Sequence, residues 1–157
     1  MSIADQTALV TGATDGVGKL VAGALARRGV RVLLHGRSQA KGDEVLAEIR
    51  ARPRTPSSGS SAPIWRRSPR CAISRRRSRP RPIGLDLLIN NAGVGSKSHG
   101  VTGRELSRDG YELRFAVNYL APFLLTHLLL PTIRRSAPAR IVNVAARPAS
   151  RRSISTT

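Results

Sequence analysis

Short apolar runs alternate along this chain with stretches of helical periodicity, and the alternation predicts the fold. The runs at residues 7–11, 30–35, 85–90 and 140–145 are rich in Val, Leu and Ile, which is typical of strands buried on both faces. From residue 17 onward the apolar positions recur three or four apart, which indicates a helix. Strands that alternate with helices form a parallel sheet, so we predict an α/β fold with a doubly wound parallel sheet.

Two further helices are predicted from the same periodicity. Residues 39–50 have one apolar side, and Ser38 precedes them as a helix cap. Residues 109–135 predict a long helix in which Pro122 is expected to cause a bend. The four apolar runs are the strands that the sequence clearly predicts. No good strand is predicted between the runs at 30–35 and 85–90, where the fold requires its third strand, and none is predicted after 140–145. We therefore expect a sheet that is incomplete at its C-terminal side and exposes buried-type sequence at both edges.

A glycine turn with the sequence TGATDGVG, at residues 11–18, joins the first strand to the first helix. Gly12 permits a tight turn, Gly16 lets the backbone approach a pyrophosphate, and Gly18 lets the helix pack close to the strand. Asp15 is interpreted as a helix cap, because its charge would repel a phosphate. The spacing differs from the standard dinucleotide fingerprint and from a Walker loop. We predict a pyrophosphate at this helix N-terminus, and the alternative is a turn without a ligand.

The end of the second strand bears on the choice of dinucleotide. An acidic residue at this point of a dinucleotide fold binds the 2'-hydroxyl of NAD, whereas an arginine accommodates the 2'-phosphate of NADP. The chain has Arg37 here and no acid. This favours NADP over NAD, and the alternative is that Arg37 is a solvated surface charge.

Three more motifs follow the glycine turn in order: NNAG at residues 90–93, FAVNYL at 115–120, and the strand RIVNVA at 140–145. Together the four motifs resemble those of the short-chain dehydrogenase/reductase family. The sequences at 107–112 and 122–126 are similar to the retinol-dehydrogenase-like branch. The resemblance implies a Rossmann-type sheet and an oxidoreductase that transfers a hydride between NADP(H) and a small-molecule carbonyl or alcohol substrate.

The resemblance also implies roles for single residues. Gly12, Gly16, Val17 and Gly18 would hold the pyrophosphate. The last three NNAG residues, Asn91, Ala92 and Gly93, would line the ribose and nicotinamide side, and Arg37 would meet the 2'-phosphate. Asn118 would be the asparagine of the catalytic tetrad, holding a water in the proton relay. Its alternative role is that of a helix residue that satisfies a backbone carbonyl. The candidate catalytic residue is thus Asn118, and the candidate cofactor-binding residues are Gly12, Thr14, Asp15, Gly16, Val17, Gly18, Arg37, Asn91, Ala92 and Gly93.

The family's other catalytic groups do not occur in these 157 residues. Its reaction uses a serine, a tyrosine and a lysine four residues after that tyrosine, which lowers the tyrosine pKa. The two tyrosines here, Tyr111 and Tyr119, are followed at that spacing by Phe115 and Phe123, and the expected serine is Ala146. We therefore expect the chain as written to be inactive, and the alternative function is a non-catalytic dinucleotide-binding remnant.

Residues 51–83 differ in composition from the rest of the chain. They carry ten arginines and six prolines without a lysine or an acid, so we expect neither helix nor strand but disorder, as also for the tail at 147–157. Shifting the reading frame at Ala62 of a GC-rich gene turns residues 62–77 into ADLASLAEVRDLAAEI, and the same shift after Ala146 yields a serine. We hypothesise a truncated, frame-disrupted reductase in which 1–157 form one partial NAD(P)-binding domain. A gene sequence that reads continuously in the present frame would contradict this.

The formal charge of +18 raises a third possibility, a basic nucleic-acid-binding protein. We disfavour it, because ten of the 27 basic residues lie within 51–83 and aromatic residues make up only 3% of the chain. We expect no specific nucleic acid as a partner. A homo-oligomer that pairs through the helix at 109–135 is possible by resemblance to many relatives.

Cellular location and metal content are inferred from what the sequence contains. The first strand begins within about six residues and leaves no room for a secretory signal, and no apolar run reaches about eighteen residues, so we expect no membrane span. The single cysteine agrees with a cytoplasmic location. The three histidines are scattered without metal-ligand spacing, so we expect no metal site.

Overall fold

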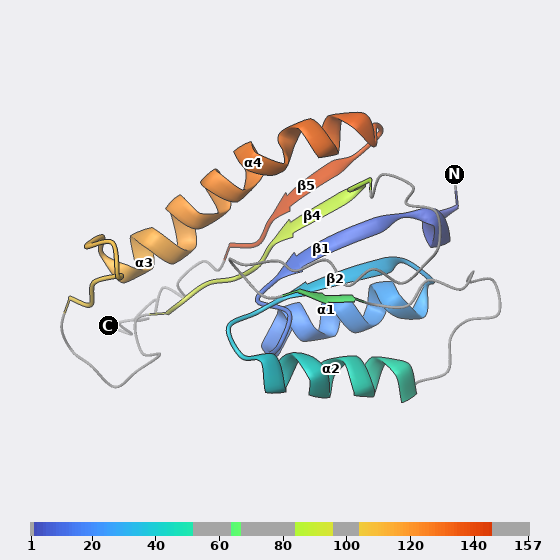
Figure 1. Cartoon of the computed structure of the whole chain (residues 1–157), viewed down its shortest axis with the longest axis horizontal. Coiled ribbons are helices and arrows are strands. Elements are labelled where there is room, and N and C mark those ends of the chain that lie inside the picture. Colours follow the sequence, from blue (N-terminus) through green and yellow to red (C-terminus); the bar gives the residue numbers. More distant parts are fainter. Residues whose placement is uncertain (1, 52–63, 67–83, 96–103, 146–157) are drawn as a thin grey trace, which may run out of the picture.

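The computed structural model describes residues 2–51, 64–66, 84–95 and 104–145, which form a parallel sheet with helices on both faces (Figure 1). Neighbouring strands in the order β3-β2-β1-β4-β5 are all parallel. The direction of winding reverses between β1 and β4, as in a doubly wound fold. The predicted fold class is confirmed. The strands are β1 (Thr7–Thr11), β2 (Arg31–His35), β3 (Ile64–Arg66), β4 (Leu87–Asn90) and β5 (Arg140–Asn143).

Helices α1 (Gly16–Arg27) and α2 (Gln39–Ala51) lie on one face of the sheet, and α3 (Leu113–Phe115), η2 (Ala116–Leu120) and α4 (Ala121–Arg135) run as one long helix on the other (Figure 1). A short helical turn, η1 (Ile3–Asp5), precedes β1. Right-handed crossovers explain this division, because β2 and β3 are added on one side of β1 whereas β4 and β5 are added on the other, which places the helix between β4 and β5 on the opposite face.

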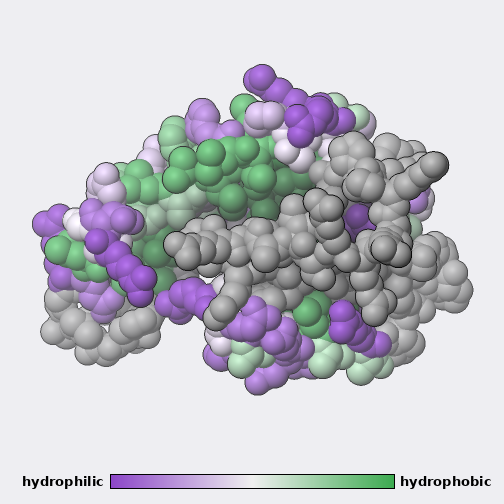
Figure 2. Space-filling view, viewed as in Figure 1, coloured by the Kyte–Doolittle hydropathy of each residue, from purple (hydrophilic) through white to green (hydrophobic). Residues whose placement is uncertain are grey.

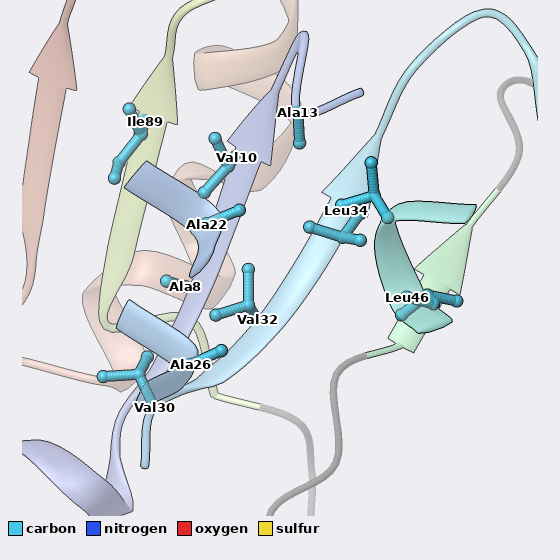
Figure 3. Packing of buried hydrophobic residues seen from close by; sticks show 11 residues of the cluster. Ala8, Val10, Ala13, Ala22, Ala26, Val30, Val32, Leu34, Leu46 and Ile89 are labelled. Carbon is cyan, nitrogen blue, oxygen red and sulfur yellow. The ribbon is translucent and has the colours of Figure 1, made fainter. Parts of the chain in front are cut away.

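The main core lies between the sheet and α1 (Figure 3). Val10, Val32 and Leu34 project from β1 and β2 and are fully buried. Ala22 and Ala26 of α1 pack against them. Because these helix residues are small, the axis of α1 can approach the strands closely, which brings the beginning of the helix to the end of β1.

The opposite face is covered less completely. A smaller cluster contains Leu85, Leu88 and Ile133, with Leu9 and Leu125 packed against it. Much of the long helix and strand β5 remain exposed, and Figure 2 shows hydrophobic side chains gathered over this region. The exposed large hydrophobic residues here are Phe115, Tyr119, Phe123, Leu124, Leu128, Ile141, Val142 and Val144. The predicted exposure of buried-type sequence is therefore confirmed at the β5 edge.

The structure corrects the prediction that residues 51–83 contain no strand. Residues Ile64–Arg66 form β3, in which Ile64 pairs with Leu33 of β2 and Trp65 with Leu34. The physical reason is that the edge of β2 offers backbone partners to a segment of β-forming residues free of proline. Ala51 ends α2. The remaining residues of 51–83 and the tail at 147–157 lie outside the described residues, so their predicted disorder stays a prediction.

The long helix also differs from its prediction. It begins at Leu113 rather than at 109, because Gly110 adopts a φ of 81° in a turn. Glu112 then caps the helix by accepting a 2.7 Å hydrogen bond from the Phe115 N–H, which is the main cause that lowers the pKa of this carboxyl. Within the long helix, the turn that departs from regular α-helical geometry is η2, which is a π-helix. Pro122 lies just after it, in the first turn of α4, where proline is tolerated.

The stretch Leu113–Arg135 is long and apolar enough to cross a membrane, judged by length and composition alone. The prediction of no membrane span counted unbroken apolar runs and missed this stretch, which Asn118 and His127 interrupt. In the structure its inner side packs on the sheet through residues such as Leu129 and Ile133. Only 6% of its most apolar 18-residue portion is buried.

The beginnings of three strands are joined through Asp86. Its buried carboxylate accepts a 2.7 Å hydrogen bond from the Thr7 N–H, and its own backbone bonds to Thr7 and Arg140. We expect Asp86→Ala to lower the free energy of unfolding by about 1–3 kcal/mol, because the buried Thr7 N–H loses its acceptor. Urea unfolding measures this. Asp86→Asn keeps an acceptor oxygen and should lose less, and equal losses in the two variants would contradict this role.

Candidate functional site

The glycine turn connects β1 to α1 as the sequence predicts. Gly12 and Gly16 have φ values of 64° and 50°, a region that side chains disfavour. Gly18 is buried, and a Cβ atom there would overlap the carbonyl oxygen of Gly12. Asp15 is the N-cap of α1, and its carboxylate accepts a 2.7 Å hydrogen bond from the Gly16 N–H. The predicted roles of Asp15 as a cap and Gly18 as a packing glycine are thus seen directly.

The beginning of α1 is open to a ligand. Asp15 binds the N–H of Gly16 through its side chain and that of Lys19 through its carbonyl. The N–H groups of Val17 and Gly18 lie between these two, in the first turn, where a helix has unpaired donors and the positive end of its dipole. Gly16 and Val17 are exposed, and Thr14 is half-buried beside them. An anion can therefore approach this end of the helix.

The loop after β4 is tied to the glycine turn by Thr11 and Asn91. The Thr11 hydroxyl accepts hydrogen bonds from the N–H groups of Asn91 (2.9 Å) and Ala92 (3.0 Å). The Asn91 side chain donates to the carbonyls of Thr11 (3.0 Å) and Gly12 (3.4 Å). Sequence analysis missed Thr11 as a positioning residue, although a threonine at the end of an apolar strand was a signal. These bonds hold the glycine turn and the loop after β4 together at the carboxyl ends of β1 and β4.

Arg37 lies at the same edge of the sheet. The N–H of Ala13 donates a 3.0 Å hydrogen bond to the carbonyl of His35, so the glycine turn is attached to the end of β2, two residues before Arg37. The Arg37 side chain is exposed. Burial lowers the pKa of neighbouring His35, so its imidazole favours the neutral form. The positive charge available at the end of β2 is therefore that of Arg37.

Asn118 lies in η2 and is bound to the loop after β4. Its Oδ1 accepts a 2.8 Å hydrogen bond from the Val94 N–H, and its Nδ2 donates to the Val94 carbonyl at 3.1 Å. A Cβ atom on Gly93 would lie 3.4 Å from the Asn118 oxygen. The side chain thus satisfies backbone groups, which is the structural alternative that the sequence allowed. Its catalytic role stays a prediction.

A cavity of about 960 Å³ lies between the long helix and the ends of β4 and β5. Four of the predicted site residues line it: Asn91, Ala92, Gly93 and Asn118. The glycine turn and Arg37 do not line the cavity. Asn91, which does line it, is hydrogen-bonded to the glycine turn through its side chain. The remaining lining residues are Asn90, Val94, Gly95, Tyr119, Pro122, Phe123, Thr126, His127, Asn143, Val144 and Ala145.

This geometry fits a dinucleotide. The reversal of winding between β1 and β4 creates a crevice at the carboxyl ends of the strands, where doubly wound sheets bind ligands. The exposed beginning of α1 lies on one side of it and the cavity on the other. Gly16 is exposed and nothing lies within 4 Å of the position of a Cβ atom there, so its backbone is the part of the turn that a pyrophosphate could approach. Among the described residues, no three His, Cys, Asp or Glu side chains gather as metal ligands.

Neither tyrosine of the described part is followed at the fourth position by a lysine, the residue that the family's pattern has there. Tyr119 lines the cavity, and its ring lies between those of Phe115 and Phe123, at centroid distances of 5.4 and 6.3 Å. The position four residues after it is therefore an aromatic stacking partner rather than a lysine. Tyr111 lies in the turn before the helix. The expected serine position, 146, lies outside the described residues.

Comparison with known proteins identifies the class. The sequence model described as short chain dehydrogenase matches residues 6–156, so the chain belongs to the short-chain dehydrogenase family. It is 40% identical over 148 residues to human dehydrogenase/reductase SDR family member 13, covering 89% of this chain and 35% of that protein. It is 38% identical over 148 residues to mouse retinol dehydrogenase 12, covering 92% and 44%. The chain thus spans less than half the length of these curated relatives.

Solved structures agree in fold. A putative short chain dehydrogenase from Escherichia coli CFT073, complexed with NADPH, is 26% identical with a TM-score of 0.60, and the match covers 87% of this chain and 57% of that one. A putative short chain dehydrogenase from Pseudomonas syringae is 27% identical with a TM-score of 0.61, covering 92% and 58%. The chain is therefore similar to somewhat more than half of a complete family structure.

Proposed function

We propose that this chain binds NADP(H) as the cofactor-binding part of a short-chain dehydrogenase, whose reaction is hydride transfer between the nicotinamide and a carbonyl or alcohol substrate. The observation that carries the proposal is the crevice between β1 and β4. The exposed, side-chain-free backbone of Gly16 at the beginning of α1 lies on one side of it, and a cavity lined by Asn91 and Asn118 lies on the other.

The preference for NADP over NAD rests on charge. The end of β2 offers the exposed guanidinium of Arg37, and no carboxylate follows the strand to bind a ribose hydroxyl. A guanidinium forms paired, charge-assisted hydrogen bonds with phosphate. The solved relative from Escherichia coli that is complexed with NADPH supports the same choice.

We further propose that these 157 residues bind the cofactor without turning over substrate. General acid catalysis needs a proton donor near the nicotinamide with a suitable pKa. The family lowers the tyrosine pKa with a lysine four residues later, and neither tyrosine of this chain has one. The small-molecule substrate would enter the cavity beside Tyr119 and Phe123, whose aromatic rings favour an apolar compound.

Titration with NADPH tests both parts of the proposal. We expect saturable enhancement of nicotinamide fluorescence on binding, with weaker binding of NADH and no turnover of ketones, aldehydes or alcohols. A folded chain that binds neither nucleotide would overturn the proposed function. Measurable turnover would overturn only the second part, because it would require a proton donor that the family pattern does not identify here.

A further inference from the structure

Three polar side chains, which we call the amide cluster, meet where β4, β5 and α4 come together. Asn90, the last residue of β4, is 6% exposed. Its Nδ2 donates hydrogen bonds to Thr126 Oγ1 of α4 (3.2 Å) and to Asn143 Oδ1 of β5 (2.9 Å). Asn90 and Asn143 are also register partners in the sheet. One buried amide of β4 therefore connects to two elements whose partner residues lie 36 and 53 residues further along the chain.

The cost in stability argues that the amide cluster does more than hold the fold together. The Oδ1 atom of Asn90 is buried and has no hydrogen-bond partner within the described part of the chain. An unpaired buried acceptor destabilises a protein, whereas apolar side chains of similar shape avoid this cost. On the same face of the sheet, two residues before Asn90, Leu88 makes the contact with α4 through such apolar packing, against Ile133.

The location of the amide cluster suggests its role, because all three residues line the cavity. The long helix forms the opposite wall and is attached to the ends of the strands at two polar points. Asn118 binds Val94, and two turns later Thr126 binds Asn90. The second attachment therefore holds α4 close to β4 at the cavity and contributes to the width of the cavity.

We propose that Asn90, Thr126 and Asn143 are positioning residues that hold the cavity open at the width required by the nicotinamide half of the cofactor. The inference rests on the proposed binding of NADPH. The adenosine half would be held elsewhere, by the glycine turn and Arg37, whose contacts do not involve the amide cluster. Loss of the cluster should therefore weaken the nicotinamide contacts alone.

Two ligands separate the halves of the site: NADPH, and adenosine 2',5'-bisphosphate, which lacks the nicotinamide. We expect Thr126→Val to weaken NADPH binding about two- to tenfold, the change that corresponds to one lost hydrogen bond, with unchanged binding of the bisphosphate. The emission maximum of bound NADPH should also shift toward that of free NADPH. Thr126→Ser keeps the hydroxyl and should restore both properties.

Ser136→Ala is the matched control. The Ser136 hydroxyl also ties the long helix to a strand segment, by accepting a 2.8 Å hydrogen bond from the Leu85 N–H, but it does not line the cavity. We expect a similar loss of thermal stability in both variants, with altered NADPH binding in Thr126→Val alone. If Thr126→Val left the ratio of NADPH affinity to bisphosphate affinity unchanged, the inference would be overturned and the proposed function would stand. Failure of the unsubstituted chain to bind NADPH would overturn both.

Discussion

Gly18→Ala is expected to weaken NADPH binding at least about tenfold. The added Cβ would overlap the carbonyl oxygen of Gly12 and lie 2.5 Å from the Asn91 side-chain nitrogen. Because one of these atoms is backbone, α1 and the glycine turn must move apart. The N–H groups that would meet the pyrophosphate then lose their alignment. Fluorescence titration with NADPH measures the effect.

Gly23→Ala is the matched control for this substitution, since it adds the same methyl group to the same helix. The nearest atom to its Cβ is a nitrogen of the Arg27 side chain, at 3.7 Å. We expect unchanged NADPH affinity and a gain of about 0.5–1 kcal/mol in the free energy of unfolding, because alanine is favoured over glycine within a helix. Unaltered NADPH affinity in a folded Gly18→Ala protein would refute the assignment of the pyrophosphate site.

Arg37→Ala is expected to weaken NADPH binding by about ten- to a hundredfold while NADH affinity changes by less than about twofold. Charge-assisted hydrogen bonds to a phosphate account for a loss of this size, and NADH has no 2'-phosphate to lose them. The prediction depends on the position of Arg37 two residues after β2, whose end is bonded to the glycine turn at Ala13. Parallel titrations with the two reduced nucleotides measure the ratio.

Removal of any positive charge from so basic a chain weakens the binding of an anion in general. Arg50→Ala controls for this, because Arg50 is an exposed arginine in the last turn of α2, at the other end of that helix from Arg37. We expect Arg50→Ala to affect NADPH and NADH alike and only slightly. Equal losses for the two nucleotides in Arg37→Ala would indicate a general charge effect and would remove the basis for an NADP preference.

Local sequence patterns were sufficient to predict the sheet and the glycine turn. Strand β1 matches its predicted range, and β2, β4 and β5 each lie within theirs. Buried strands can be read locally because both of their faces must be apolar. The positive φ values of Gly12 and Gly16 are likewise a local property of the residue type. The nearly complete match of α2 to its predicted range follows from helical periodicity in the same way.

Element boundaries required more than periodicity. The long helix begins at Leu113 because a turn at Gly110 and a cap at Glu112 precede it, and these compete with an apolar pattern that extends further. Strand β3 formed within residues of unfavourable composition because the edge of β2 supplied backbone partners. Pairing with a neighbouring element overrides local propensity in such cases.

By itself, the sequence determined the parallel α/β architecture, the dinucleotide-type turn and the family to which the chain belongs. Only the tertiary structure decided the polar contacts that shape the cavity: Thr11 with Asn91, Asn118 with Val94, and Asn90 with Thr126. The physical reason is distance along the chain. Apolar periodicity and glycine conformation are encoded within a few neighbouring residues, whereas these hydrogen bonds join groups 24 to 80 residues apart and depend on how whole elements pack.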